Sequence, residues 1–124
     1  MDKNVKVLVK KRLEKAQEDL ETARELFKSK RYRALANRAY YSIFAITNAM
    51  LLTKDGERVK HSGVESAFNQ FFVKAEIFPK EYGKIYKFLR KQREDSDYKF
   101  SDIKKEVAEK ILSDLAIFVK KVEK

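Results

Sequence analysis

The chain of 124 residues contains no cysteine and no tryptophan, and it has only one histidine, one proline and three glycines. The absence of cysteine excludes disulfide bonds and thiolate metal sites, and it fits a reducing compartment. The N-terminus opens with Asp2, Lys3 and Lys6 and has no apolar core, so we expect no signal peptide and a cytoplasmic protein. We expect neither a metal site nor a cofactor.

The scarcity of glycine and proline argues against a sheet-rich fold, because sheets need frequent turns. Charged residues make up 39% and hydrophobic residues 44% of the chain, a balance typical of helical proteins. Apolar residues recur every three or four positions between Val9 and Phe27, which predicts one long amphipathic helix from about Asp2 to Ser29. The length allows one domain, residues 1–124.

A second predicted helix follows a short turn, and its window from Ala39 to Thr53 contains no charged residue. At 15 residues, and with several polar side chains, this window is too short and too polar to span a membrane. We therefore predict a central helix that is buried by its own bundle on one side and by a second subunit on the other. The predicted homodimer has this helix or the fourth helix at its interface. Phe44 and Ile46 are predicted core residues, and Phe44→Ala would then cost about 3 to 5 kcal/mol.

Three further helices are predicted from capping signals and periodicity. The third begins at Ser62, because this serine and the glutamate three residues later form a capping-box pattern. Pro79 belongs to the first turn of the fourth helix, which runs to about Asp97. The last helix is capped by Ser101 or Asp102. The predicted fold is all-α, an up-and-down bundle of five helices.

The fourth predicted helix carries a stripe of charged residues that resembles a binding site. Arg90, Arg93 and Asp97 are three and four residues apart, so two guanidinium groups and a carboxylate share one face at the boundary of the core. Partly shielded arginines make bidentate contacts to phosphate or carboxylate groups. The alternative interpretation is an ion pair within the helix, between Arg93 and Asp97.

The formal net charge of +10 permits a nucleic acid or another anionic partner. Basic residues are spread along the chain and alternate with acidic ones, as on solvated helix faces, so the charge alone identifies no site. The start of the third helix is a second candidate for anion binding, because Lys60 and His61 lie beside its free N–H groups. The simpler interpretation is that Ser62 caps this helix and His61 packs.

Three segments carry a resemblance to a known family. They are Arg38-Ala-Tyr-Tyr-Ser-Ile-Phe44, Lys60-His-Ser-Gly-Val64 and the stretch from Arg90 to Tyr98. In this order they resemble the HEPN superfamily of prokaryotic helical domains, specifically its small stand-alone branch. The resemblance implies a dimeric helical bundle, in many relatives encoded beside a minimal nucleotidyltransferase as toxin and antitoxin.

Several HEPN proteins are metal-independent ribonucleases, and their signature is an arginine, four to six residues and a histidine, often followed by X-Tyr. Here Arg90 fits, but Asp97 stands where the histidine would be, and Tyr98 follows it directly. A histidine can move protons near neutral pH, whereas an aspartate beside two arginines stays ionised. His61 could supply the missing base only if folding or a second subunit brings it to Arg90.

We therefore expect a HEPN-like homodimer that binds a nucleotide, RNA or a minimal nucleotidyltransferase partner without catalysis of its own. The expected binding residues are Arg90, Arg93, Asp97, Tyr98, Lys60, His61 and Ser62. The alternative is a metal-independent endoribonuclease toxin of a toxin–antitoxin pair that uses Arg90 with Asp97 or His61. We expect no association with membranes.

Overall fold

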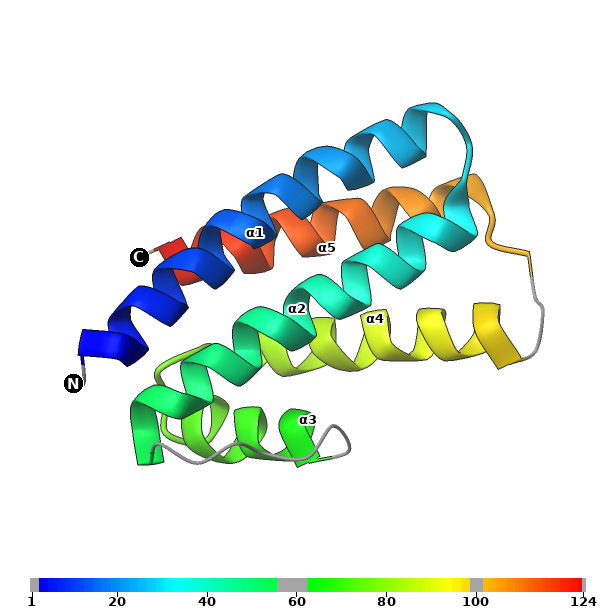
Figure 1. The fold of residues 1–124 in the computed structure, drawn as a ribbon. Helices are drawn as coiled ribbons and strands as arrows, with labels where there is room; N and C mark the ends of the chain where they lie inside the picture. The colour runs from blue at the N-terminus through cyan, green and yellow to red at the C-terminus, as the bar shows by residue number, and fades with distance from the viewer. Residues whose placement is uncertain (1–2, 56–62, 99–101, 124) are drawn as a thin grey trace.

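The computed structural model of the protein describes residues 3–55, 63–98 and 102–123. These residues form five α-helices and no strand, so the predicted all-α class is confirmed (Figure 1). None of the described helices has an apolar stretch long enough to cross a membrane. The helices are, in chain order, α1 (Lys3–Lys28), α2 (Tyr32–Asp55), α3 (Val64–Phe68), α4 (Glu81–Tyr98) and α5 (Lys105–Glu123), and a π-helical segment, η2 (Asn69–Val73), continues α3.

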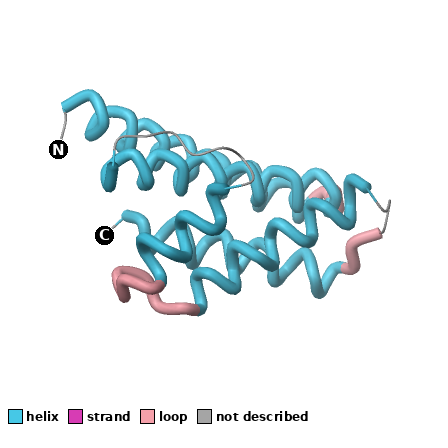
Figure 2. Tube along the Cα trace, turned by 90° about the horizontal axis from the view of Figure 1, so that it is seen from below, coloured by secondary structure: helices cyan, strands magenta, loops and turns pink. Residues whose placement is uncertain are grey.

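Four long helices run up and down the molecule, and the short α3–η2 segment lies across one end of α2 (Figure 1). The view from below shows the same arrangement, with long parallel tubes and short loops at their ends (Figure 2). Helix α2 packs against α1, α3, α4 and α5, and α5 returns along α1. The second helix is therefore the central element, as its charge-free window predicts.

The turn between α1 and α2 uses a left-handed residue that is not glycine. Lys30 has a φ of 62°, and its N–H and that of Arg31 donate to carbonyls of the last turn of α1. This pattern ends a helix because it satisfies carbonyl groups that have no partner within the helix. It sends the chain straight back, so that α2 lies antiparallel to α1 (Figure 1).

The central helix is covered by its own chain on its core-facing side, while Arg33, Ala34, Asn37, Arg38 and Tyr41 are exposed. Ala36 and Ala39 are buried against the rest of the core, and small side chains of this kind let neighbouring helices approach closely. Ile46 is buried as predicted, but Phe44 is only partly buried and packs at the edge of the core. Among the large hydrophobic residues of α2 whose side chains are described, Tyr41 alone is exposed.

A cluster of aromatic rings closes the end of the bundle where α3 lies. Phe68 is fully buried, and its ring centre lies 5.4 to 5.9 Å from those of four other rings. Distances in this range are typical of favourable aromatic contacts. The four rings come from η2, the η2–α4 connection, α4 and α5, and they belong to Phe72, Phe78, Tyr86 and Phe118.

Close packing of η2 against α4 depends on a glycine inside α4. A Cβ atom at Gly83 would lie 2.6 Å from the side-chain oxygen of Asn69, which is shorter than any normal contact. Helix interiors disfavour glycine by about 1 kcal/mol relative to alanine. Gly83 is therefore best explained by the space that Asn69 occupies.

Two predicted helix starts are wrong, and a third falls on a residue outside the described part of the chain. Helix α3 begins at Val64 with Gly63 as its N-cap and without a side-chain cap, while Ser62 lies outside the described residues. Helix α4 begins at Glu81, so Pro79 precedes it, and the carbonyl of Pro79 accepts a hydrogen bond from the N–H of Tyr82. Helix α5 begins at Lys105, too late for Ser101 or Asp102 to cap it. A turn at Lys80 precedes α4, and residues 102–104 before α5 have no regular structure, so helix propensity alone does not fix where either helix begins.

The packing of the aromatic cluster leads to a stability prediction. Phe68→Ala is expected to lower the free energy of unfolding by about 3 to 5 kcal/mol, because it leaves a cavity among four rings. Phe44→Ala is expected to cost less than Phe68→Ala, since its ring is already partly in solvent. Urea denaturation followed by circular dichroism measures both values. Equal losses for the two variants would contradict this description of the core.

Candidate functional site

Arg93 lies between α4 and α2 and is held from several sides. Its Nε lies 3.1 Å from Oδ2 of Asp97, which confirms the ion pair within the helix. Its Nη2 donates a hydrogen bond of 2.6 Å to the hydroxyl of Tyr41. The guanidinium carbon is 5.3 Å from the ring centre of Tyr40 and 5.1 Å from that of Tyr41, within range of a cation–π contact. Only 14% of this side chain is exposed, so Arg93 joins the two helices.

Burial raises the pKa of Tyr40, and the positive charge of Arg93 opposes this shift only in part. The Tyr40 hydroxyl therefore stays protonated at neutral pH and offers no base. The two tyrosines belong to the segment Arg38 to Phe44, so that segment meets the charged stripe of α4 at this point. The structure thus brings together two of the three segments that carry the family resemblance.

Arg90 faces a different neighbour, the short helix α3. Its Nε donates to a carboxylate oxygen of Glu65, and its Nη1 donates to both carboxylate oxygens of Glu94, at 3.1 and 3.2 Å. The hydrogen bond to Glu65 raises the pKa of Arg90, so the group is a cation throughout the physiological range. Two carboxylates already engage this guanidinium, and an incoming phosphate would have to displace at least one of them.

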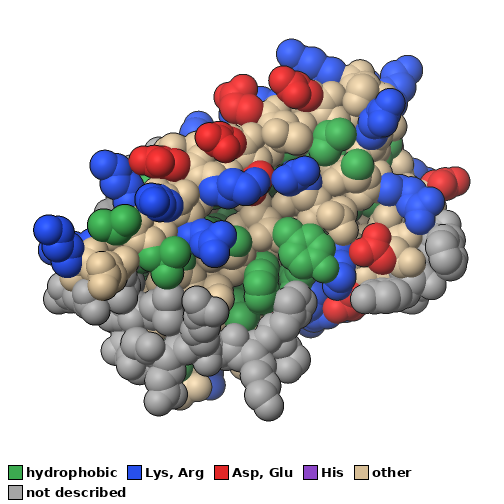
Figure 3. Space-filling view, in the orientation of Figure 1, with side chains coloured by type: hydrophobic (Ala, Val, Ile, Leu, Met, Phe, Trp, Pro, Cys, Tyr) green, Lys and Arg blue, Asp and Glu red, His purple; other side chains and the backbone are tan. Residues whose placement is uncertain are grey.

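A groove lies between α1 and α2 near the C-terminal end of α4, with a volume of about 450 Å³. In Figure 3, acidic side chains gather along α1, and basic side chains follow the seam below it. Asp97 reaches this groove, which joins it to the Arg93 ion pair. The residues that line the groove are Thr22, Leu26, Arg33, Ala34, Asn37, Arg38 and Asp97.

The two arginines of this groove are held by neighbouring groups. Nη2 of Arg33 donates to the carbonyl oxygen of Ser96 at 2.9 Å, and its Nε donates to the Ser96 hydroxyl at 3.3 Å. Nη1 of Arg38 lies 3.4 Å from Oδ1 of Asp19, which Lys15 also contacts at 2.8 Å. Such contacts reduce the rotamer freedom that each arginine would lose on binding an anion.

Sequence reasoning missed Arg33, Asn37 and Arg38 as groove residues. A signal was present, because Arg33 and Asn37 are spaced i,i+4 and Arg38 opens the segment that carries the resemblance. It was not decisive, since arginines on an amphipathic helix usually face solvent. The groove exists only because α1, α2 and α4 meet at this point.

Several predicted site residues fall outside what the structure describes. Lys60, His61 and Ser62 lie in the undescribed stretch 56–62. Tyr98 is the last residue of α4, but the position of its side chain is not described. The proposal that His61 supplies a base to Arg90 therefore stays a prediction.

The chemistry of the described groove favours binding over proton transfer. Its ionisable members are two arginines and the aspartate that Arg93 pairs with. Arginine is not deprotonated in proteins, and the groove contains no histidine among its lining residues. Within the described residues, the groove therefore offers cationic and amide donors for an anion.

Comparison with known proteins agrees with the geometry. The family model described as "HEPN domain" matches residues 9–124. A protein named "Putative toxin" from Methanocaldococcus jannaschii is 34% identical over 124 residues, which cover all of this chain and 92% of the relative. A second protein of that name from the same organism is 35% identical over 125 positions, covering all of this chain and 85% of the relative. A UPF0332 protein from Thermotoga maritima is 42% identical over 84 residues, 68% of this chain and 64% of the relative.

The helical bundle, the joined segments of α2 and α4, and these matches define the class of this protein. The chain belongs to the HEPN domain family. The resemblance drawn from three short segments is thereby confirmed for nearly the whole chain.

The contacts of Arg90 and Arg93 predict that both arginines support the fold. Arg90→Gln is expected to lower the free energy of unfolding by about 1 to 2 kcal/mol, because Glu65 and Glu94 lose their cation in a partly buried setting. Arg24→Gln is the control, since Arg24 forms an exposed pair with Glu21 whose loss costs well under about 1 kcal/mol. Urea denaturation measures the free energy of unfolding of both variants. Equal losses would show that the contacts of Arg90 add nothing to the stability of the fold.

Proposed function

We propose that this HEPN protein binds a phosphate-bearing ligand, RNA or a nucleotide, in the groove between α1, α2 and α4, and that it does so without catalysis of its own. The observation that carries this proposal is the groove itself, where two arginines and the Asn37 amide surround a space of about 450 Å³. Volumes of about 300 to 1,000 Å³ are typical of small-molecule sites. A nucleotide, or one unit of an RNA strand, fits this range.

Charge and geometry both support a phosphate ligand. Arg33 and Arg38 both line the groove, and an arginine contact to a phosphate is stronger and more directional than a lysine contact. Asn37 adds an amide that can donate as well. The net charge of +10 would also speed the approach of an anionic ligand.

Tyr41 gives the groove a neighbour that suits a nucleobase. Its side chain is exposed to 39%, on the α2 face that also carries Arg33 and Asn37 at intervals of four residues. Aromatic rings stack on bases of single-stranded RNA, and contact with Arg93 holds this ring in place. Phosphate at the arginines and a base near Tyr41 together favour a single-stranded RNA or a nucleotide over double-stranded RNA.

The lack of catalysis is proposed because of Asp97. It occupies the position of the histidine in the ribonuclease signature, and in the structure it is paired with Arg93. This position therefore lacks the imidazole that moves protons near neutral pH in a ribonuclease.

A binding experiment tests the proposal directly. Fluorescence anisotropy with a labelled single-stranded RNA is expected to show binding that weakens as salt rises, because bound phosphates release counterions. The double variant Arg33→Gln, Arg38→Gln is expected to bind about tenfold or more weakly. Arg24→Gln is the matched control. The exposed fraction of the Arg24 side chain is 45%, close to the 44% of Arg38, but Arg24 lies outside the groove.

Competition with ATP in the same assay separates the two ligand classes. Displacement of the RNA at micromolar ATP would favour a nucleotide site, and its absence would favour RNA. If the double variant bound RNA as the wild type does, with an unchanged melting curve, the groove would not be the site. Lys60, His61 and the start of α3 would then be the better candidate.

The name "Putative toxin" of the two M. jannaschii relatives supports a second candidate function. In this candidate the protein is a metal-independent endoribonuclease toxin that uses Arg90 with Asp97 or His61. Incubation of the purified protein with labelled RNA in the presence of EDTA separates the candidates, and we expect no cleavage above that of buffer. Cleavage that Arg90→Gln and His61→Ala abolish, while both variants stay folded, would establish the toxin activity instead.

The expected partners stay predictions. A homodimer with α2 or α4 at its interface is one of these predictions. The expectation of a minimal nucleotidyltransferase partner rests on the family resemblance alone. Neither partner is needed to form the groove between α1, α2 and α4, called the arginine groove below, because its lining residues all come from one chain.

A further inference from the structure

The basic side chains of α1 are concentrated in its first three turns. Residues 3–12 contain five basic side chains and no acidic one, whereas residues 14–28 contain three basic and five acidic ones. In the part of the chain that the structure describes, none of these five forms an ion pair with a carboxylate. The five residues are Lys3, Lys6, Lys10, Lys11 and Arg12.

This arrangement does not stabilise α1. The first turn has no acidic residue, and its lysines oppose the helix dipole, whose positive end is at the N-terminus. Lys6 and Lys10 are four residues apart, so their like charges repel along the helix. Among the side chains described in this helix, the first buried one belongs to Ala16. Local features that weaken a fold are expected at functional sites, which makes this part of α1 a candidate for binding.

One face of α1 continues the wall of the arginine groove toward these turns. Two residues of α1 line the groove, at positions 22 and 26, and Asp19 lies 3.4 Å from the groove residue Arg38. Arg12 and Lys15 precede them at the same spacing, since positions 12, 15, 19, 22 and 26 are three or four apart and share one face. Lys11 borders this face. We call Lys11, Arg12 and Lys15, beside the line where α1 meets α2, the basic seam.

The glutamates of α1 lie on a different face from the basic seam. They are also three or four residues apart, and their stripe is turned by roughly 100° from that of the seam. Figure 3 shows this separation, with acidic side chains along α1 and basic side chains below them. Asp19 lies on the seam face, but Lys15 and Arg38 already engage it. The glutamates are Glu14, Glu18, Glu21 and Glu25.

Across the seam, α2 presents an aromatic ring at a matching height. The two helices are antiparallel, so a step from the Asp19–Arg38 contact toward the start of α1 is a step toward the end of α2 (Figure 1). Lys15 is four residues before Asp19, and Tyr41 is three residues after Arg38, so both lie roughly 5 to 6 Å beyond that contact. Tyr41 is exposed, and the small side chain of Ala45 follows about one turn later.

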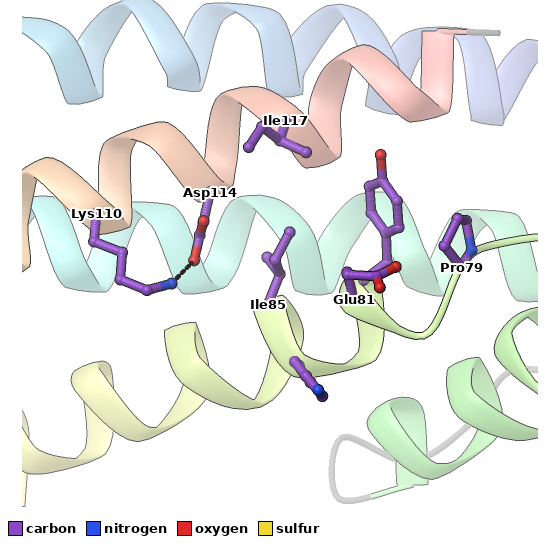
Figure 4. A pocket seen from close by; sticks show the side chains of 8 residues that line it. Pro79, Glu81, Ile85, Lys110, Asp114 and Ile117 are labelled. Atoms are coloured by element: carbon purple, nitrogen blue, oxygen red, sulfur yellow. Dashed lines mark hydrogen bonds and ion pairs between the residues drawn. The ribbon is translucent and has the colours of Figure 1, made fainter.

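The groove between α4 and α5 carries no comparable excess of charge. It has a volume of about 560 Å³ and a largely apolar wall (Figure 4). Two lysines and two carboxylates line it, and one of each, Lys110 and Asp114, form an ion pair of 2.6 Å. A polyanion is therefore attracted more strongly by the unpaired cations of α1 than by this groove.

We propose that an RNA strand bound in the arginine groove continues along the basic seam, where Lys11, Arg12 and Lys15 contact its phosphates and Tyr41 stacks on a base. This path depends on the proposed function, since the strand starts in the arginine groove. Arg12 is ten residues before Thr22, about 15 Å along α1, so a single nucleotide in the groove does not reach it. The ligand class is therefore single-stranded RNA of several nucleotides rather than a free nucleotide.

Two other anionic occupants fit the seam less well. A helix that lies on a membrane needs an open apolar face, and in the described part of α1 the only large hydrophobic side chain that is exposed is that of Val7. An acidic protein would need a packed anchor at the centre of its interface, and the same part of α1 offers none. RNA needs only cations for its phosphates and a ring for a base.

Anisotropy with a labelled single-stranded RNA of about 20 nucleotides tests the path. The seam variant Lys11→Gln, Arg12→Gln is expected to bind about tenfold more weakly. Its slope of log affinity against log salt is expected to be shallower by about 1.4, since each lost phosphate contact to a single strand removes about 0.7. A labelled dinucleotide is too short to reach from the groove to Arg12, so its affinity is expected to match that of the wild type.

Lys6→Gln, Lys10→Gln is the matched control. It removes the same charge from the same part of α1, and both lysines are exposed, but helical spacing places them on the side opposite the seam. We expect this variant to bind the long RNA nearly as well as the wild type. Lys11→Arg, Arg12→Lys keeps both charges and is expected to keep the affinity. Melting curves check that all variants are folded.

Several results would overturn the proposal. Equal weakening by the seam variant and the control would show attraction by net charge alone. Wild-type affinity of the folded seam variant for the long RNA would show that the strand takes another path. Weaker binding of the dinucleotide would show that the seam variant damages the groove. Loss of affinity in the charge-preserving variant would indicate a packing role for Lys11 and Arg12.

Two further measurements separate this proposal from the proposed function and from a membrane. If Arg33→Gln, Arg38→Gln weakened the binding of both RNAs while the seam variant weakened neither, the arginine groove would stand and only the path along the seam would fail. If the seam variant lost binding to vesicles containing phosphatidylserine but kept wild-type binding to RNA, the seam would belong to a membrane surface instead.

Discussion

Burial of α2 is the physical constraint on which the other elements of this protein depend. Its uncharged stretch must be kept from water, and α1, α3, α4 and α5 all pack against it. Each neighbour contributes an apolar stripe, and the polar faces of the outer helices then form the surface. Two grooves result at places where side chains of adjacent helices do not fill the space between them, one near α1 and α2 and one between α4 and α5.

The arginines of this protein divide into two groups with different consequences. Arg90 and Arg93 each meet carboxylates or aromatic rings and fasten α4 to α3 and α2. Arg33 and Arg38 are also held in position, but they line an open groove. An anion can reach the second group from the open groove, whereas at Arg90 it would compete with the carboxylates of Glu65 and Glu94.

Periodicity and charge patterning predicted most of the fold, because an amphipathic stripe and a charge-free window follow directly from residue order. Helix starts were less predictable, as Pro79 shows, since turns before a helix depend on tertiary packing. The spacing of Arg93 and Asp97 predicted their pairing, which is local. It could not reveal Glu65 or Tyr41 as partners, because these lie 25 and 52 residues away from Arg90 and Arg93 respectively. The arginine groove was missed for the same reason.

The return of α5 along α1 and α2 has a consequence for synthesis on the ribosome. The last helix supplies Leu115 and Phe118, both fully buried, to a core that the first two helices begin. While α5 is still inside the exit tunnel, the apolar face it will cover stays open to water and to other chains. The hairpin of α1 and α2 can form early because its contacts are local in sequence, but the core closes only after α5 has left the exit tunnel. A nascent chain of this protein would therefore need protection along that face until α5 emerges.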